Sequence, residues 1–257
     1  MYTQTYCFSK DVFYREQKLT HPFIESFFEI HNAQQTPIIT IPDCCVEIHF
    51  FYADAKPSVY IAGTALVGRQ LKHPITNNCF GIRFKPAIIS NNFKSFFKNI
   101  IDSNYEITEL FPFKVMLDLM ATSASFENRM AITNRYIHCL GEFTLHPLVK
   151  SVIYELKKNC LATRIETIIN GSGYSHRHVD RVFKGDTGMS VKFFSNVLRI
   201  QTAIHLMTYH KTHNMIELSA KLGFYDQAHF NRSFKQFTCQ TPTSFASNTA
   251  RSAVLPK

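Results

Sequence analysis

The chain has 257 residues and a formal net charge of +9, with 45% hydrophobic residues, 24 Phe, no Trp and seven Cys. Because it contains no Cys-x-x-Cys pair, no apparent signal segment and no apolar run as long as roughly 18 residues, we expect a cytoplasmic protein with reduced thiols and no membrane partner. It also lacks paired carboxylates, a glycine-rich phosphate loop and a nucleophile elbow, which argues against ATPase and hydrolase chemistry, so we expect neither enzyme activity nor a cofactor.

The first half of the chain begins with short segments rich in Ile, Val, Phe and Tyr, separated by Pro, Asp and Gly. Segments of this kind predict β-strands, here at residues 38–41, 46–52, 59–61 and 80–84. The apolar spacing becomes helical from Ala87 onward, and a further helix is predicted to begin near Ser125. The apolar positions are Ile89, Phe93, Phe96, Phe97 and Ile100 in the first helix, and Phe126, Met130, Ile137 and Leu140 in the second.

The Phe residues are concentrated in this first half, where 16 of the 24 precede Thr144. They have two interpretations. Phe side chains line apolar pockets that take lipid or aromatic effectors, but they also form the core of a sheet and its covering helices. We favour core packing, because a sequence alone does not distinguish a pocket from a core.

A metal-dependent enzyme or metal sensor is the alternative function for this half. Glu47 and His49 alternate on one strand face, so both point at the same side of a sheet. A metal site needs at least one more ligand, and His31 and His73 stand at no recognisable spacing. We interpret the remaining candidates, His205, His210 and His213, as surface or core residues of a helix and its exit.

Adjacent Cys44 and Cys45 leave a redox sensor open as a related alternative. Thiols of this kind are more often small core fillers, and neighbours in a strand point to opposite faces. Core filling is therefore the interpretation that we prefer.

A boundary between two domains is predicted near residues 141–147, where Pro147 is suited to open a helix, and we divide the chain into 1–143 and 144–257. Residues 1–144 carry 13 Lys/Arg and 13 Asp/Glu, whereas residues 145–257 carry 15 and 6. The whole positive excess therefore lies in the C-terminal part. A polyanion is its natural partner, and nucleic acid fits better than a membrane surface because no long helix with a broad apolar face is present.

The C-terminal part contains one pattern twice, at an offset of 51 residues. Each copy reads as a short helix, a turn at Gly and a second helix with an apolar pair at i and i+4, and the second turn is one residue longer. The pairs are Val179 with Phe183, and Phe230 with Phe234. Ser175 and Asp226 occupy matching N-cap positions four residues before these pairs.

The side of each second helix that faces away from its apolar pair is basic. A single such stripe is usually the solvated face of an amphipathic helix. The duplication, the turns and the charge together favour helix-turn-helix units that enter the DNA major groove. This face holds Arg177, Arg181 and Lys184 in the first copy, and Ala228, Asn231, Arg232 and Lys235 in the second.

Over about residues 145–250 the chain resembles the AraC/XylS family of bacterial transcription regulators. The resemblance rests on Gly173-Tyr-Ser175, Arg181-Val-Phe183-Lys184, Gly188-Met-Ser190, Arg199 and Ala203, and on Ile216, Leu218, Leu222-Gly-Phe224, Asp226-Gln227, His229-Phe230, Arg232-Ser-Phe234-Lys235, Thr241-Pro242 and Phe245. Cys239 departs from the pattern where Gly is usual, and Ala246 stands where a basic residue often follows the aromatic.

The resemblance implies an all-α domain in which a long helix joins two helix-turn-helix units, so that one chain reads two successive major-groove segments. Residues 191–211 supply such a helix, with Phe194, Val197, Leu198, Ile204 and Met207 on one apolar face. The implied base-contact candidates are Arg177, Asp180 and Arg181 in the first unit, and Gln227, Ala228, His229, Asn231 and Arg232 in the second. Asp180 has a competing role, since it stands four residues before Lys184 and is placed for an ion pair.

Ile41-Pro-Asp43, Val46-Glu-Ile48, Gly63 and Gly81-Ile-Arg83-Phe-Lys-Pro86 resemble the small β-barrel sensor domains that precede this module in many relatives. We therefore expect an α+β protein in which a barrel-like domain with following helices modulates a sequence-specific transcription regulator, with activation the family's commoner mode. The implied partners are promoter DNA and RNA polymerase, and the resemblance leaves a small-molecule effector and a homodimer open.

Overall fold

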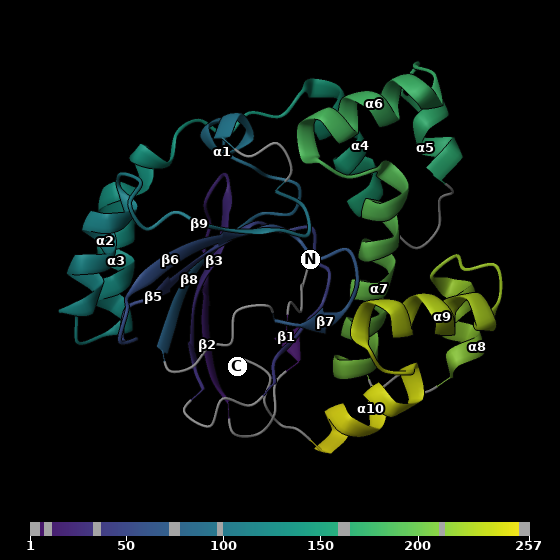
Figure 1. Cartoon of the computed structure of the whole chain (residues 1–257). Coiled ribbons are helices and arrows are strands. Elements are labelled where there is room, and N and C mark those ends of the chain that lie inside the picture. The colour runs from purple at the N-terminus through teal and green to yellow at the C-terminus, as the bar shows by residue number, and fades with distance from the viewer. Residues whose placement is uncertain are drawn as a thin grey trace.

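The computed structural model describes residues 6–7, 12–32, 37–71, 78–96, 100–158, 165–210 and 214–251. The chain runs from a region of β-sheets through a group of helices into a second group of helices beside the sheets (Figure 1). This is the mixed α+β fold with a barrel-like first half that the sequence predicts.

Two antiparallel sheets build the first half, in the orders β2-β3-β8-β5-β6-β9 and β1-β4-β7. They remain separate, so the barrel is not closed. The strands are β1 (Tyr6–Cys7), β2 (Phe13–Lys18), β3 (Ile24–His31), β4 (Ile39–Thr40), β5 (Glu47–Phe51), β6 (Ser58–Ala62), β7 (Arg69–Gln70), β8 (Asn78–Phe84) and β9 (Asn104–Glu106).

The larger sheet is buried on both faces, because alternate side chains point to opposite sides of a strand. On one face Phe50 and Phe80 pack against α2 (Phe113–Ala121) and α3 (Phe126–Tyr136). On the other face Phe28 and Phe51 belong to a smaller cluster with residues of the small sheet, including Tyr6. The Phe residues thus serve as core on both sides of the sheet.

The four predicted strands are present as β4, β5, β6 and β8, each within two residues of its expected bounds. Sequence reasoning missed β2 and β3 because polar residues interrupt their apolar pattern. Strand β2 lies at the edge of the sheet and exposes much of its length. In β3, Glu29 is buried because its carboxylate pairs with Arg129 of α3, with Oε1 and Nη2 2.7 Å apart.

The helices of the first half differ more from the prediction. The helix expected from Ala87 begins later, as α1 (Asn91–Phe96), because Ala87 has φ 68° and its N–H donates to the carbonyl of Cys44. Residues 97–99 lie outside the described residues, and Ile100 lies outside α1. Helix α2 was missed, whereas α3 begins after its N-cap Ser125 as predicted and continues into a 3₁₀ turn, η1 (Ile137–Leu140).

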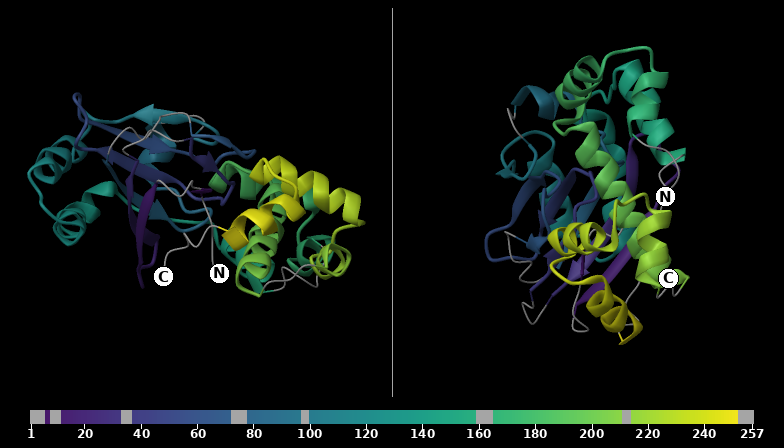
Figure 2. Two further views of the ribbon diagram at one scale, coloured as in Figure 1. Left: turned by 90° about the horizontal axis from the view of Figure 1, so that it is seen from below. Right: turned by 90° about the vertical axis from the view of Figure 1, so that its right-hand side faces the viewer.

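The C-terminal helices are α4 (Pro147–Lys158), α5 (Ile165–Gly171), α6 (His176–Thr187), α7 (Val191–Tyr209), α8 (Met215–Lys221), α9 (Gln227–Thr238) and α10 (Pro242–Arg251). Pro147 opens α4 as predicted. Helix α7 connects the α4–α6 group to the α8–α10 group (Figures 1 and 2). It has its expected apolar residues buried and ends at Tyr209, while Lys211 lies outside the described residues.

Candidate nucleic-acid interface

Helices α5 and α6, with residues 172–175 between them, form a helix-turn-helix that we call unit one. Ser175 caps α6, since its Oγ accepts a hydrogen bond from the backbone N–H of His178 at 3.3 Å. Val179 and Phe183 are 1% and 0% exposed. These two anchors decide which face of α6 is left for a partner.

Helices α8 and α9 form unit two, and their connection over residues 222–226 is one residue longer than that of unit one, as predicted. Asp226 caps α9 through Oδ1, which accepts from the N–H of His229 at 2.6 Å. Phe230 and Phe234 are fully buried. The predicted caps and anchors of both units are therefore confirmed.

The 51-residue repeat extends to side-chain hydrogen bonds at the ends of α6 and α9. Thr187 and Thr238 each donate to the carbonyl four residues earlier, both at 2.8 Å. Ser190 and Thr241 each accept from the N–H three residues later, at 3.1 and 3.2 Å. Units one and two are the same local structure built twice.

The residues expected to contact DNA lie on α6 and α9, away from the buried anchors. All of them are exposed except Asn231, which is half-buried. Their positive charge is therefore accessible to a polyanion. These residues are Arg177, Asp180, Arg181 and Lys184 in unit one, and Gln227, Ala228, His229, Asn231, Arg232 and Lys235 in unit two.

Asp180 has a structural partner that neither of its expected roles included. Its Oδ1 accepts a hydrogen bond at 3.1 Å from the backbone N–H of Val191, the first residue of α7. In unit two the corresponding position is Pro242, which has no N–H, and Asn231 stands in place of Asp180. The carboxylate thus caps the connecting helix in unit one, a role that has no counterpart in unit two.

Sequence reasoning missed Tyr174 and His178, whose rings stack 5.0 Å apart at 15° on unit one. The repeat contained a signal for His178, because it stands 51 residues before His229, which was identified. Tyr225, just before the cap of α9, is 93% exposed. Aromatic side chains therefore lie at the N-terminal ends of both α6 and α9.

Helix α7 also holds the turn of unit two. The guanidinium of Arg199 donates through Nη1 to the carbonyl of Gly223 at 3.3 Å and lies 5.9 Å from the ring of Phe224. Unit two is therefore attached to the connector by its turn as well as by the core.

Contacts from the first half of the chain reach both units and the connector. The N–H of Gly68 donates to the carbonyl of Gln236 near the end of α9 at 2.8 Å. The buried Gln201 of α7 donates through Nε2 to the carbonyl of Pro42, also at 2.8 Å. At the end of α6, Asp186 pairs with Lys94, with Oδ1 and Nζ 3.0 Å apart. We call these three contacts the clamp.

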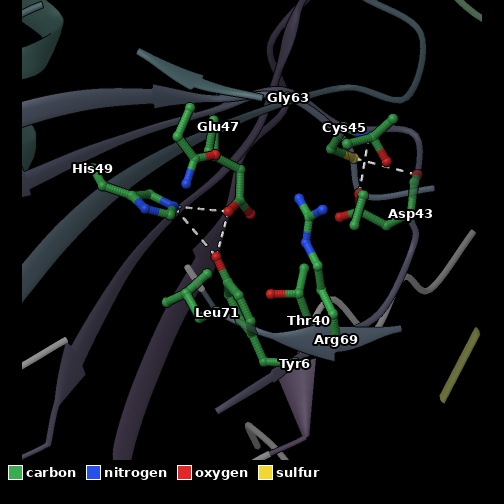
Figure 3. Close-up of a pocket in the computed structure, with 13 residues that line it drawn as sticks. Tyr6, Thr40, Asp43, Cys45, Glu47, His49, Gly63, Arg69 and Leu71 are labelled. Carbon is green, nitrogen blue, oxygen red and sulfur yellow. Dashed lines mark hydrogen bonds and ion pairs between the residues drawn. The ribbon is translucent and has the colours of Figure 1, made fainter. Parts of the chain in front are cut away.

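Polar side chains cluster around Glu47 of β5, in the barrel-like first half of the chain. Its carboxylate is 2.6 Å from Nε of Arg83. It is also 2.9 Å from Nε2 of His49, and the hydroxyl of Tyr6 donates to it (Figure 3). Burial by itself raises the pKa of Glu47, but the charge of Arg83 and the hydrogen bonds from His49 and Tyr6 outweigh burial and lower this pKa to about 2. The carboxylate is thus held ionised by its neighbours.

Glu47 and His49 share a strand face as expected, but their side chains hydrogen-bond to each other and to Tyr6. Within the described ranges no group of three or more His, Cys, Asp and Glu is placed to hold a metal ion. His31 bonds to Asn78, and His205 packs against Tyr209 and His210. His73 and His213 lie outside the described residues. The metal hypothesis gains no support.

Cys44 and Cys45 are buried, and burial together with nearby Asp43 raises the pKa of both thiols. Such thiols form little thiolate, the reactive species, so core filling describes them better than redox sensing. The expected strand geometry is wrong for this pair, because Cys44 lies in a turn with φ 62° before β5.

The cavity beside Glu47 is small, about 30 Å³, and Thr40, Asp43 and Arg69 are among its polar lining residues (Figure 3). That volume suits about one water molecule. An apolar hollow of about 210 Å³ lies elsewhere, between α1 and residues 110–113, lined by Phe93, Leu110, Phe111 and Phe113 among others. None of the helices in the described part of the chain combines the length and apolar character of a membrane span.

Residues 170–248, which include the turn and α6 of unit one and all of unit two, match a family model described as a helix-turn-helix domain, which is of the AraC type. A probable transcription factor, PqrA of Proteus vulgaris, is 29% identical over 109 residues, which cover 42% of this chain and 88% of PqrA. The chain therefore contains an AraC-type helix-turn-helix domain, the DNA-binding part of a transcription regulator.

Two solved structures show limited similarity to this chain. The C-terminal domain of AraT, a response regulator from Geobacillus stearothermophilus, is 19% identical, covering 40% of this chain and 87% of that domain, with a TM-score of 0.38. ToxT from Vibrio cholerae is 11% identical, covering 95% and 98% of the two chains, with a TM-score of 0.41.

Proposed function

We propose that the protein is a sequence-specific regulator that reads two adjacent major-groove segments. In this proposal α6 of unit one reads the first segment, and α9 of unit two reads the second. The observation that carries this proposal is the double construction of the reading units. Arg181 and Arg232 are exposed at corresponding positions, 51 residues apart, on two helices with the same caps and anchors. A protein that used one helix would not need the second basic face.

The chemistry of these faces suits base edges. An Arg guanidinium forms bidentate hydrogen bonds with guanine, and an Asn or Gln carboxamide does so with adenine. Helix α7 has 19 residues and is therefore roughly 28 Å long, which is comparable with one turn of DNA at roughly 34 Å. The proposed operator is asymmetric, because the two reading faces differ in sequence.

Substitution of the two arginines tests the proposal. We expect Arg181→Ala and Arg232→Ala each to weaken binding to the promoter site by about 1–3 kcal/mol and to relax base preference in a different segment. Arg135→Ala on α3 removes an exposed arginine far from both units in sequence and is the matched control. Full retention of affinity and preference in both reading variants would exclude these helices as readers.

We propose further that residues 1–143 form a regulatory domain that acts on residues 144–257 through the clamp. The three clamp contacts reach α6, α7 and α9 separately, so they fix the position of unit two relative to unit one. Binding of a rigid pair of units loses less conformational freedom than binding of two loosely joined ones. The clamp therefore favours simultaneous binding of both segments.

Activation of transcription through RNA polymerase, with or without a second copy of the chain or a small-molecule effector, completes the proposal. Two of the pocket-lining residues, Asp43 and Arg69, each directly follow a clamp residue, so a change in that cavity reaches the clamp over one peptide bond. In vitro transcription from the bound promoter measures the sign of regulation. Reduced transcript on addition of the protein would contradict activation.

A further inference from the structure

Tyr174, His178 and Arg181 form a row along the reading helix of unit one. His178 and Arg181 are three residues apart on one face of α6, and Tyr174 lies in the turn just before the N-cap Ser175. The Tyr174 ring stacks on His178 at 5.0 Å and 15°, and Nη2 of Arg181 lies 3.3 Å from Nδ1 of His178. The row joins the turn to the arginine that is proposed to read bases.

The direction of the second contact follows from the chemistry of its atoms. A guanidinium only donates hydrogen bonds, so Nδ1 of His178 is the acceptor and the neutral imidazole carries its hydrogen on Nε2. The stacked Tyr174 ring restrains rotation of the imidazole. Through the imidazole, it also restrains the guanidinium.

We infer that Tyr174 and His178 are positioning residues that hold the guanidinium of Arg181 in its reading orientation before DNA arrives. This inference rests on the proposed base-reading role of Arg181. Ordering a long side chain on binding weakens association, and a guanidinium that is already oriented avoids part of this loss. The expected gain is about 3- to 10-fold in affinity.

Unit two is built differently at the equivalent place. His229 packs edge-on against Phe224, at 5.4 Å and 83°, and Tyr225, which corresponds to Tyr174, is 93% exposed. The stacked arrangement is therefore a feature of unit one. Removing the stack should relax base preference in the segment read by unit one and leave base preference in the other segment unchanged.

The experiment measures binding of the full-length chain to a duplex selected from a random library, and to single base-pair variants of both segments. We expect Tyr174→Ala to lower affinity about 3- to 10-fold and to relax base preference at the Arg181 position of the first segment. Tyr174→Phe should restore both properties, because the ring alone provides the stack. Tyr154→Ala, which removes a tyrosine 62% exposed on α4, is the control for loss of an exposed aromatic ring.

The positioning role is refuted if Tyr174→Ala and His178→Ala keep the DNA affinity and base preference of the parent chain. It is also refuted if base preference falls equally in both segments. Arg181→Ala in the same assay separates this failure from failure of the proposed function. Loss of binding in Arg181→Ala with none in Tyr174→Ala rejects the positioning role alone. Unchanged binding in Arg181→Ala rejects base reading by unit one.

Discussion

Cys239 ends α9 in the same left-handed conformation in which Gly188 ends α6, with φ values of 60° and 77°. The two residues are 51 positions apart, so Cys239 occupies the glycine position of the repeat. A residue with a Cβ is strained in this conformation, whereas glycine adopts it freely. The fold of unit two tolerates the strain because the caps and anchors around it match those of unit one.

We expect Cys239→Gly to raise the free energy of unfolding by about 1 kcal/mol, since relief of strain exceeds the added flexibility of the unfolded chain. Urea denaturation followed by circular dichroism measures the change. DNA affinity serves as the control and should stay constant, because Cys239 lies at the C-terminal end of α9, far from the N-cap Asp226. A lower unfolding midpoint would show that the side chain stabilises unit two in another way.

Gly68 tests the clamp, because a Cβ at this position would lie 2.4 Å from the carbonyl oxygen of Phe237. We expect Gly68→Val to separate this loop from α9 and to weaken binding to the two-segment site by about 5- to 30-fold, roughly 1–2 kcal/mol. Binding to a duplex that keeps only the first segment should change little. Gly171→Ala is the control, because Gly171 ends α5 and a Cβ there would have open space around it.

Two results would contradict this expectation. Equal affinities for the two-segment site would mean that the clamp does not influence DNA binding. Tighter binding by Gly68→Val would mean that the clamp holds the units in an arrangement that DNA must first disrupt. Hydrogen exchange of residues 236–238 shows independently whether the contact has opened.

Glu47 makes the sheet region sensitive to acid. A carboxylate whose pKa is lowered in the folded state, here to about 2, stabilises the fold above its unfolded pKa near 4.5, and this contribution is lost as the pH falls toward 2. We expect loss of about 3 kcal/mol over this window. The difference in the free energy of unfolding between the parent chain and Glu47→Gln, measured from pH 6 to pH 2, isolates the contribution of Glu47.

At neutral pH, Glu47→Gln should destabilise the chain by about 3 kcal/mol, because it leaves buried Arg83 without one of its two close carboxylates. Glu127→Gln is the comparison, since Glu127 also pairs with an arginine but is exposed. Similar acid sensitivity in Glu47→Gln and the parent chain would assign the transition to other carboxylates.

Two substitutions of Asp180 distinguish a structural role from contact with bases. Asp180→Ala removes the acceptor for the N–H of Val191 and should destabilise the AraC-type domain by about 1 kcal/mol. Asp180→Asn retains an acceptor oxygen, so stability and base preference should both remain near those of the parent chain. An altered base preference in Asp180→Asn, measured with the operator variants, would indicate that Asp180 does contact bases.

The sequence by itself determined the repeat, the caps and anchors of both units and the basic faces of α6 and α9. These features depend on local spacing, because residues four apart on a helix share a face and a cap acts within one turn. Strands with a clear apolar pattern, such as β5 and β8, were predictable for the same reason.

Only the tertiary structure decided the features that depend on partners distant in sequence. Glu29 is acceptable in a buried strand because Arg129 lies opposite it, 100 residues away, and Gly68 is required because the end of α9 lies against it. Asp180 caps α7 because the chain turns back after α6. Local spacing carries no information about which distant residue supplies a charge, a donor or a steric limit, so these roles appear only when the chain is folded.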